Sequence, residues 1–448
     1  MDFFQYKNEH LHVEDIPLRA IAEAAGTPTY VYSQQTLTDH YDRFKAAFAP
    51  LDPLICYAVK SCPNLSICRL LAERGAGMDV VSGGELYRAL EAGANPASCV
   101  YAGVGKTDAE IEQALKAGIG WFNIESEAEF ENISLIAARL RIACSAALRI
   151  NPDVDPRTHT YTTTGKKETK FGVDLERART FFATYGNDPY CHLNALHLHI
   201  GSPVYDVQPY VTSVTRALQL MDDLETQGHT IRMLDLGGGY GADYHSQQSP
   251  TAAEYAAALI PLLQERVNAG LKIVLEPGRS IAANAGILLL RTLYVKTSGS
   301  KTFIICDGGM NVLLRPSHYG SFHFIWPVDV DTSFVPERRS EDMSDMSGLQ
   351  IADVVGPICE SGDFLAKDRA LPPVARGDLI AVFTAGAYGM SMANRYNAMP
   401  LPAEVLVHRS SATIISQRET FTDLLRQERN VTPLKFDPRS AVAESPSI

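Results

Sequence analysis

The chain has 448 residues, 46% of them hydrophobic, and its 52 Asp and Glu outnumber its 40 Lys and Arg, which gives a formal net charge of −12. This acidic balance argues against nucleic acid or an anionic membrane surface as the main partner. The sequence has no signal-peptide pattern and no run of the ~20 apolar residues that a membrane helix requires, so we expect a cytoplasmic protein of two domains.

Eight apolar runs of strand length alternate with stretches of helical spacing over the first two thirds of the chain. Two of the helical stretches begin with a Ser followed three residues later by a Glu, at Ser82 and Ser126, which is the pattern of a capping box. The alternation predicts a closed (β/α)8 barrel of parallel strands, with an open Rossmann-type sheet as the alternative. The predicted strands are 54–59, 78–81, 98–101, 121–124, 146–150, 195–200, 231–235 and 272–275.

The pattern changes after about residue 285, where apolar or alternating runs are broken by Gly and Pro. We expect a mainly β domain there. Three segments show no convincing periodicity: a long polar connection, an insertion expected to be exposed, and a flexible tail. The predicted strands of the β domain are 287–295, 302–306, 378–384 and 403–407, and the three aperiodic segments are 151–172, 331–349 and 431–448.

Reactive side chains follow several of the predicted barrel strands directly. Lys60 ends the first apolar run, Gly237–Gly239 follow the seventh, and Glu276 and Arg279 come after the eighth. Because parallel barrel strands end on one face, these groups are expected to meet on one rim. Each also has a plain structural explanation: a solvated cation, a tight turn, and a surface salt bridge, respectively.

Taken together, the three segments fit one cofactor chemistry. Glycines without side chains let backbone N–H groups close on a phosphate. A carboxylate such as Glu276 keeps a pyridine nitrogen protonated, and the ring then accepts the electron pair left when a bond to Cα breaks. Lys60 would hold such a cofactor as a Schiff base.

A metal site is the main alternative reading of the rim. His197 and His199 lie two apart on a predicted strand and point to the same side, as in metal-dependent barrel hydrolases. The other strand ends offer Lys60, Asp79, Glu125 and Arg149, a poor ligand set for zinc. We therefore predict no metal, with ring stacking by His199 and core packing by His197.

Other motifs carry less information. The Gly-rich segment does not complete G-x-G-x-x-G because residue 242 is Ala, and Gly105-Lys106-Thr107 is only half a P-loop because Val100 stands at its first Gly. The eight cysteines form no C-x-x-C pair, which favours reduced, mostly buried thiols over disulfides or a zinc site.

In chain order, seven segments resemble the fold-type III pyridoxal phosphate-dependent decarboxylases, and most of all their diaminopimelate-decarboxylating members. The resemblance spans about residues 10–430. It implies an alanine racemase-like (β/α)8 barrel over 35–284, a β domain formed by 1–34 and 285–430, and a homodimer with shared active sites. The segments are Tyr57–Lys60, Gly77–Glu85, His199–Ser202, Gly237–Gly239, Glu276–Arg279, Cys359–Asp363 and Gly386–Tyr388.

The resemblance also implies roles for individual residues around pyridoxal 5'-phosphate. Lys60 is the Schiff-base lysine, His199 stacks on the ring, and Glu276 meets the pyridine nitrogen. Cys359 is a catalytic residue that arrives from the partner subunit. The other cofactor-binding residues are Asp79, Arg149, Ser202, Gly238, Gly239, Gly278, Arg279 and Tyr388.

The charge of the expected substrate-binding residues indicates the substrate. Arg279 and Arg315, with Tyr319 and Tyr388, are placed to meet its far end, and two guanidiniums suit a carboxylate. Glu360, also from the partner subunit, would take an adjacent ammonium. The predicted reaction is decarboxylation of the diamino acid meso-2,6-diaminopimelate to L-lysine and CO2, the last step of lysine biosynthesis by that route.

Two alternatives remain within the resemblance: a decarboxylase of another amino acid, ornithine-like, lysine-like or carboxylate-tailed, and a cofactor-binding relative without turnover. Several positions depart from the pattern usual in the family and leave the substrate open. They are Cys62, Pro63, Val312, Arg395 and Met399.

Overall fold

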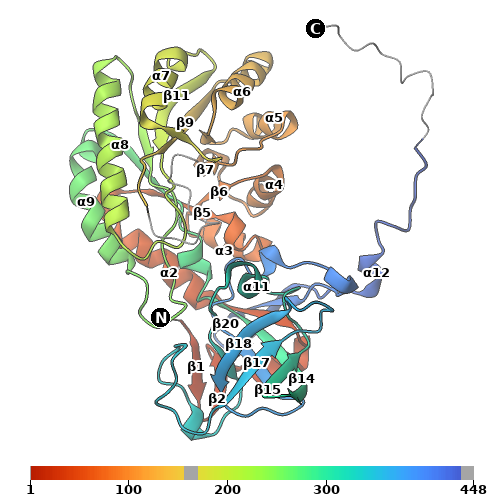
Figure 1. Ribbon diagram of the computed structural model, residues 1–448. Helices are drawn as coiled ribbons and strands as arrows, with labels where there is room; N and C mark the ends of the chain where they lie inside the picture. Colours follow the sequence, from red (N-terminus) through yellow and green to blue (C-terminus); the bar gives the residue numbers. More distant parts are fainter. Residues whose placement is uncertain (1, 156–169, 435–448) are drawn as a thin grey trace.

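The computed structural model describes residues 2–155 and 170–434, and one part of it is a closed barrel of eight parallel strands (Figure 1). Each strand pairs with the next, and the last pairs with the first through Val274 and Leu54. The barrel is therefore confirmed, and the open-sheet alternative is wrong. Its strands are β5 (Leu54–Ala58), β6 (Gly77–Val80), β7 (Cys99–Tyr101), β8 (Trp121–Ile124), β9 (Cys144–Asn151), β11 (Cys191–His197), β12 (Met233–Asp235) and β13 (Lys272–Leu275).

Helices surround the barrel and cover its outer face (Figure 1). They bury residues three and four apart, as Ile111, Ala114 and Leu115 do in α5, which is the spacing of an amphipathic helix. The short strand β10 (Val173–Asp174) extends the sheet beside β9. The helices are α2 (Gln34–Ala47), α3 (Leu65–Glu73), α4 (Gly83–Glu91), α5 (Asp108–Ala117), α6 (Glu127–Leu140), α7 (Leu175–Tyr185), α8 (Gln208–Thr226), α9 (Ala252–Asn268) and α10 (Arg279–Ala282).

The two predicted capping boxes are half right. Ser82 and Ser126 cap α4 and α6 by accepting from the backbone N–H three residues on. The Glu side chain, however, accepts from the residue before the cap: Glu85 from Val81 N at 2.8 Å and Glu129 from Glu125 N at 2.8 Å. Each helix start is thereby tied to the end of the preceding strand.

The second part of the protein is rich in β-structure, as predicted, and it draws strands from both ends of the chain. In its main sheet β4 lies between β14 and β20, although β4 comes near the N-terminus. A smaller sheet joins β1, β2 and β3. The strands are β1 (Phe4–Lys7), β2 (His10–Val13), β3 (Ile16–Pro17), β4 (Thr29–Ser33), β14 (Gly286–Ser298), β15 (Lys301–Cys306), β16 (Ile325–Pro327), β17 (Gln350–Val355), β18 (Phe364–Leu371), β19 (Leu379–Val382), β20 (Ala403–His408) and β21 (Ser411–Ser416); the helices are α1 (Leu18–Ala25), α11 (Arg315–Tyr319) and α12 (Phe421–Leu424).

The predicted connections and tail have mixed outcomes. The insertion at 331–349 is partly anchored, because Met343 is 4% exposed and the guanidinium of Arg339 lies 4.2 Å from the ring centre of Phe383. Most of the predicted connection at 151–172 and of the predicted tail at 431–448 lies outside the described residues.

The cysteines and the helices agree with the expectations from composition. All eight cysteines are free thiols, and Cys359 alone among them is exposed. Within the described ranges, no helix has the length and apolar character needed to span a bilayer.

Candidate active site

The first barrel strand brings Lys60 to the rim. β5 ends at Ala58, and a 3₁₀ turn over Val59–Ser61 carries Lys60 beyond it. The Lys60 Nζ donates to Oδ2 of Asp79 at 2.6 Å. Asp79 is fully buried on the neighbouring strand β6, where it pairs with Ala58. Burial lowers the pKa of Lys60, but the charges of Asp79 and Glu276 outweigh burial and raise it above its ordinary value. Lys60 is therefore a charged amine on a buried carboxylate.

The eighth strand places Glu276 just past its end, where the side chain is 2% exposed. Glu276 Oε1 accepts from Asn123 Nδ2 at 3.2 Å, and Oε2 lies 3.5 Å from His197 Nε2. Burial raises the pKa of Glu276, but the interactions with His197 outweigh it and the pKa is lowered. Burial and the neighbouring charge of Glu276 instead raise the pKa of Asp235. Burial thus favours the neutral form of Asp235, whereas the surroundings of Glu276 favour its charged form.

His199 lies beyond the end of β11, although the strand was predicted to continue to residue 200. His197 is the last strand residue and is fully enclosed, whereas His199 keeps 17% of its side chain exposed. The Nδ1 of His199 accepts from Gly238 N at 3.3 Å. Burial, with the charges of Arg149 and Lys60, lowers the pKa of His199 well below its ordinary value, so the ring is neutral.

The glycine triplet packs against the loops from neighbouring strands. A Cβ on Gly237 would come within 2.0 Å of the Leu198 carbonyl oxygen, and one on Gly239 within 2.3 Å of the Gly201 carbonyl oxygen. Both residues also have positive φ, 68° and 99°. Only glycine allows the backbone to pass this close to the carbonyl oxygens of Leu198 and Gly201. The prediction of a backbone cradle at this end of β12 therefore has a steric basis.

Two buried arginines meet at the junction between the barrel and the second part. Arg279, on α10, donates through Nε to Ser202 Oγ at 3.1 Å and through Nη1 to the Tyr244 hydroxyl at 2.8 Å. Its guanidinium lies 4.7 Å from the ring centre of Tyr388, and that of Arg315 lies 6.0 Å from it. Tyr388 is joined to the Lys60 turn because its N–H donates to the Ser61 carbonyl at 2.7 Å.

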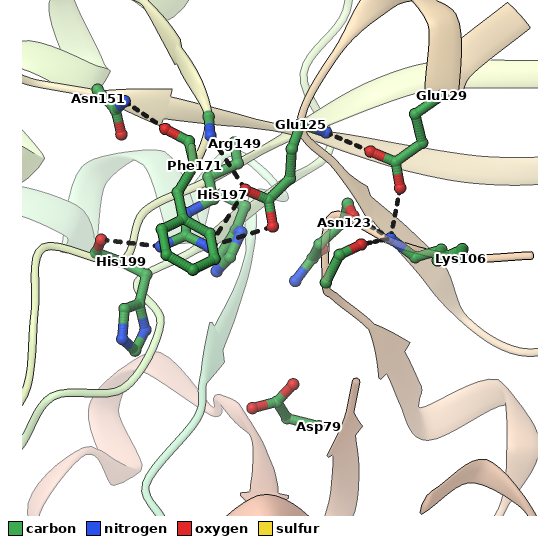
Figure 2. A network of polar contacts seen from close by, with 12 residues as sticks. Asp79, Lys106, Asn123, Glu125, Glu129, Arg149, Asn151, Phe171, His197 and His199 are labelled. Carbon is green, nitrogen blue, oxygen red and sulfur yellow. Dashed lines mark hydrogen bonds and ion pairs between the residues drawn. The ribbon is translucent and has the colours of Figure 1, made fainter. Parts of the chain in front are cut away.

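Arg149, on β9, anchors a polar network beside His199 (Figure 2). Its Nη1 pairs with Glu125 Oε1 at 3.2 Å and its Nη2 donates to the His199 carbonyl at 3.3 Å. Phe171 covers the guanidinium, 4.6 Å from the ring centre. The loop that carries His199 is thus held by a buried ion pair.

The network continues into the strand-to-helix turns. Lys106 Nζ donates to Glu129 Oε1 at 2.6 Å and to the Asn123 carbonyl at 2.9 Å, and its side chain is only 1% exposed. Glu129 in turn accepts from the N–H of Glu125. Lys106, which belongs to the rejected half P-loop, is therefore a buried structural cation that supports the rim (Figure 2).

Sequence reasoning overlooked several of the polar residues beneath the rim. Asn123 and Asp235 each interrupt an apolar strand, at Phe122–Ile124 and Leu234–Leu236, and that interruption was the available signal. Lys106 had no comparable signal, since an isolated lysine in a loop is usually solvated.

Cys359 and Glu360 are not gathered with the other predicted site residues. Both lie on the exposed loop after β17, where Cys359 N donates to Asn397 Oδ1 at 2.8 Å and Glu360 interacts with Tyr396. Tyr319 does reach the arginines, because the guanidinium of Arg315 lies 5.7 Å from its ring centre. Arg395, a departure from the family pattern, is an exposed residue paired with Glu419.

The histidine alternative has a geometric basis, because ligand atoms of His197, His199 and Glu276 lie within 4.8 Å of one another. Burial and the positive charges of Arg149 and Lys60 lower the pKa of His199, one of these three residues. Neighbouring positive charges oppose a bound metal ion. Glu276, which accepts from Asn123, is the carboxylate expected from sequence to meet a ring nitrogen.

Comparisons with known proteins agree with this geometry. Residues 34–283 match the pyridoxal-binding domain of pyridoxal-dependent decarboxylases. The chain is 43% identical over 419 residues to diaminopimelate decarboxylase of Aquifex aeolicus, covering 94% of this chain and 96% of the relative. It is 42% identical over 431 residues to the Haemophilus influenzae enzyme of the same name, covering 96% and 100%.

A solved structure gives the same result. Diaminopimelate decarboxylase from Helicobacter pylori, in complex with L-lysine, superposes with a TM-score of 0.85 at 38% identity, covering 92% of this chain and 99% of that one. These matches agree with the barrel, with the lysine after its first strand and with the carboxylate after its eighth. The chain belongs to the pyridoxal-dependent decarboxylase family.

Proposed function

We propose that the protein decarboxylates meso-2,6-diaminopimelate to L-lysine and CO2 with pyridoxal 5'-phosphate, as the last step of lysine biosynthesis. The observation that carries the proposal is the pair of buried guanidiniums, Arg279 and Arg315. Neither has a carboxylate partner within residues 2–155 and 170–434. Buried cations without acids call for an anionic ligand, and the curated relatives are diaminopimelate decarboxylases.

The acidic end of the site fits the ring of the cofactor. When bound, pyridoxal phosphate supplies an electron sink for the bond to CO2 that breaks at Cα. Lys60 would hold the cofactor through its aldehyde, and Asp79 accepts from the Lys60 amine and offsets its positive charge. Glu276, whose carboxylate accepts from Asn123 and lies 3.5 Å from His197, would keep a ring nitrogen protonated.

The remaining cofactor contacts follow from the loops around the glycines. His199, whose pKa is lowered by burial and by the charges of Arg149 and Lys60, would stack on the pyridine without adding a second positive charge. Gly238, Gly239, Ser202 and Gly278 would bind the phosphate, together with Arg279, which donates to Ser202, and Tyr388, whose ring lies beside Arg279. Arg149 Nη2 donates to the backbone carbonyl of His199 and so fixes the position of that residue.

The substrate and the assembly complete the proposal. Arg279, Arg315, Tyr319 and Tyr388 bind the carboxylate of the far amino-acid group. Glu360 and Cys359 lie on an exposed loop and act in the site of a second copy, which makes the enzyme a homodimer with shared sites. The barrel unit spans 35–284 and the β domain 1–34 with 285–430, and we place the enzyme in the cytoplasm.

One experiment tests the reaction and its substrate. Purified protein is incubated with pyridoxal phosphate and diaminopimelate isomers, lysine, ornithine, arginine or glutamate, while released CO2 is measured. Diaminopimelate is expected to exceed lysine, ornithine and arginine by roughly 10⁴-fold, because substrates without the far carboxylate leave two buried guanidiniums unpaired. A higher rate with lysine, ornithine or glutamate would favour a related decarboxylase instead.

A variant separates the decarboxylase from other uses of the barrel. Lys60→Ala is expected to lose both the absorbance of covalently bound cofactor and all CO2 release. Lys116→Ala, on the exposed face of α5 beside Glu112, serves as the control and keeps both. Wild-type protein that takes up no cofactor and stays colourless would contradict the proposal.

A further inference from the structure

The two guanidiniums proposed to read the far carboxylate come from different parts of the protein. Arg279 opens α10, directly after the last barrel strand, whereas Arg315 opens α11 in the second part. Two guanidiniums repel each other, so a buried pair needs another group that interacts with both. The residue between them is Tyr244, which sequence reasoning did not single out.

Tyr244 contacts both cations in different ways. Its hydroxyl oxygen accepts from Arg279 Nη1 at 2.8 Å, while the guanidinium of Arg315 lies 5.3 Å from its ring centre. One phenol thus offers an oxygen lone pair to one arginine and an aromatic face to the other. Burial raises the pKa of Tyr244, but the charges of Arg279 and Arg315 outweigh burial and lower it.

The backbone that carries Tyr244 is fixed to both parts of the protein. Asn284 Nδ2 donates to the carbonyl of Asp243 at 2.7 Å, and the Thr384 hydroxyl donates to the same oxygen at 3.2 Å. Asn284 lies just after α10, and Thr384 lies just after β19. Tyr244 therefore stands on a segment held at the junction.

The other neighbour of Tyr244 adds no charge to the cluster. The His323 ring meets the Tyr244 ring edge-on, with centres 5.3 Å apart, and its Nδ1 donates to the Phe383 carbonyl at 2.9 Å. Burial and the charge of Arg315 lower the pKa of His323 to about 3. His323 is thus a neutral neighbour of Tyr244 and adds no third positive charge beside the two arginines.

We propose that Tyr244 is a positioning residue that holds Arg279 and Arg315 together as one carboxylate-binding pair, and that it thereby sets the preference for substrates with a carboxylate at the far end. The inference rests on the proposed function and deepens it. It predicts that loss of the phenol oxygen weakens binding of carboxylate-bearing ligands and leaves otherwise identical amines unaffected.

The test compares two ligands that differ only in that group: L-lysine and 1,5-diaminopentane, which is lysine without its carboxylate. Calorimetric titration of the holoenzyme gives the Kd of each for wild type and Tyr244→Phe. L-lysine is expected to bind about tenfold more weakly to the variant, as for a lost hydrogen bond to a charged group, with less than twofold change for the diamine. The absorbance of bound cofactor checks that the variant is folded and loaded.

A matched control uses a tyrosine from the same region. Tyr205 donates to the Ala242 carbonyl at 3.3 Å, and Tyr205→Phe should bind both ligands like the wild type. A Tyr244→Phe variant that keeps the wild-type preference for L-lysine overturns the inference and leaves the proposed function standing. Wild-type protein without any preference for L-lysine over the diamine overturns both.

Pairing two variants gives a second readout. If the phenol oxygen of Tyr244 acts only through Arg279, Tyr244→Phe in an Arg279→Met background should weaken L-lysine binding by less than twofold, because the oxygen has then already lost its partner. Independent losses that multiply in the double variant would show that the phenol acts in another way and would overturn the inference.

Discussion

The two ends of the candidate site have opposite electrostatic character. Around Lys60, the carboxyl groups of Asp79, Asp235 and Glu276 are buried at barrel strand ends. Around Tyr244, Arg279 and Arg315 are buried among phenols and hydroxyls. The acidic end balances an amine and a ring cation, whereas the basic end is balanced only when anions bind. The site is therefore built for a ligand that is positive at one end and negative at the other.

The two ends also differ in what the fold must supply. The acids stand on barrel strands, so closure of the barrel alone brings them together. The arginines stand on α10 and α11, which meet only when the second part packs on the barrel. The acidic end is thus built by the barrel alone, and the basic end needs both parts of the protein.

The largest expected effect breaks the acidic end. Glu276→Gln keeps the shape of the side chain but removes the charge that holds a ring proton, so kcat should fall roughly 10³-fold. The rate of CO2 release at saturating cofactor measures it. Glu404→Gln is the control, because Glu404 is also buried but accepts from Tyr32 of the second part and from Asn64 at the start of α3. Equal losses in both variants would mean that Glu276 has no special electronic role.

A smaller effect is expected from breaking the basic end. Arg315→Met should lower kcat/KM for diaminopimelate about 30-fold, as for the loss of one charge-assisted hydrogen bond worth about 2 kcal/mol. Cofactor absorbance should stay unchanged, since Arg315 contacts Tyr244, Tyr319 and Tyr388. Arg291→Met, whose Nη1 donates only to the Gly377 carbonyl, provides the comparison. Loss of cofactor from Arg315→Met would contradict the division between the two ends.

The smallest expected effect concerns pH at the acidic end. Burial raises the pKa of Glu85 to about 7 from its ordinary 4.5, so its protonated form favours the fold, and this contribution is lost as pH rises through about 7. Removing the charge of Glu85 should raise the free energy of unfolding only at pH values where Glu85 is ionised. In urea denaturation, Glu85→Gln should match wild type at pH ~5 and exceed it by on the order of 1 kcal/mol at pH ~8.

A neighbouring glutamate provides a control of opposite sign. Hydrogen bonds from the backbone of Gly83 and Thr107 lower the pKa of Glu110, so its stabilisation is present above its ordinary pKa and is lost in acid. Glu110→Gln should therefore be less stable than wild type at pH ~8. If both variants change the free energy of unfolding in the same direction at pH ~8, burial is not what sets the pKa of Glu85.

Local sequence patterns were sufficient for the barrel and for the residues at its strand ends. Apolar runs followed by a lysine, glycines or a carboxylate placed Lys60, Gly237–Gly239 and Glu276 correctly on one rim, because a parallel barrel gathers its strand ends on one face. The strand predicted at 195–200 ends at His197. The pattern of apolar residues alone cannot show at which residue a strand ends.

The contacts that depend on distant segments could not be predicted in this way. The pairing of Tyr244 with arginines from α10 and α11 joins three separate stretches of chain. β4 also escaped prediction, since its partners lie more than 250 residues away along the chain, at Gly286 and beyond. Such contacts have no local period to reveal them.

The place of β4 bears on how the protein is made. The ribosome releases residues 29–33 early, but the two strands that flank them begin at residues 286 and 403. The barrel strands can close in the interval, while β4 has both edges exposed and open to mispairing. A protein cut short before residue 403 would keep one of those edges bare permanently, and aggregation of such fragments is the expected result.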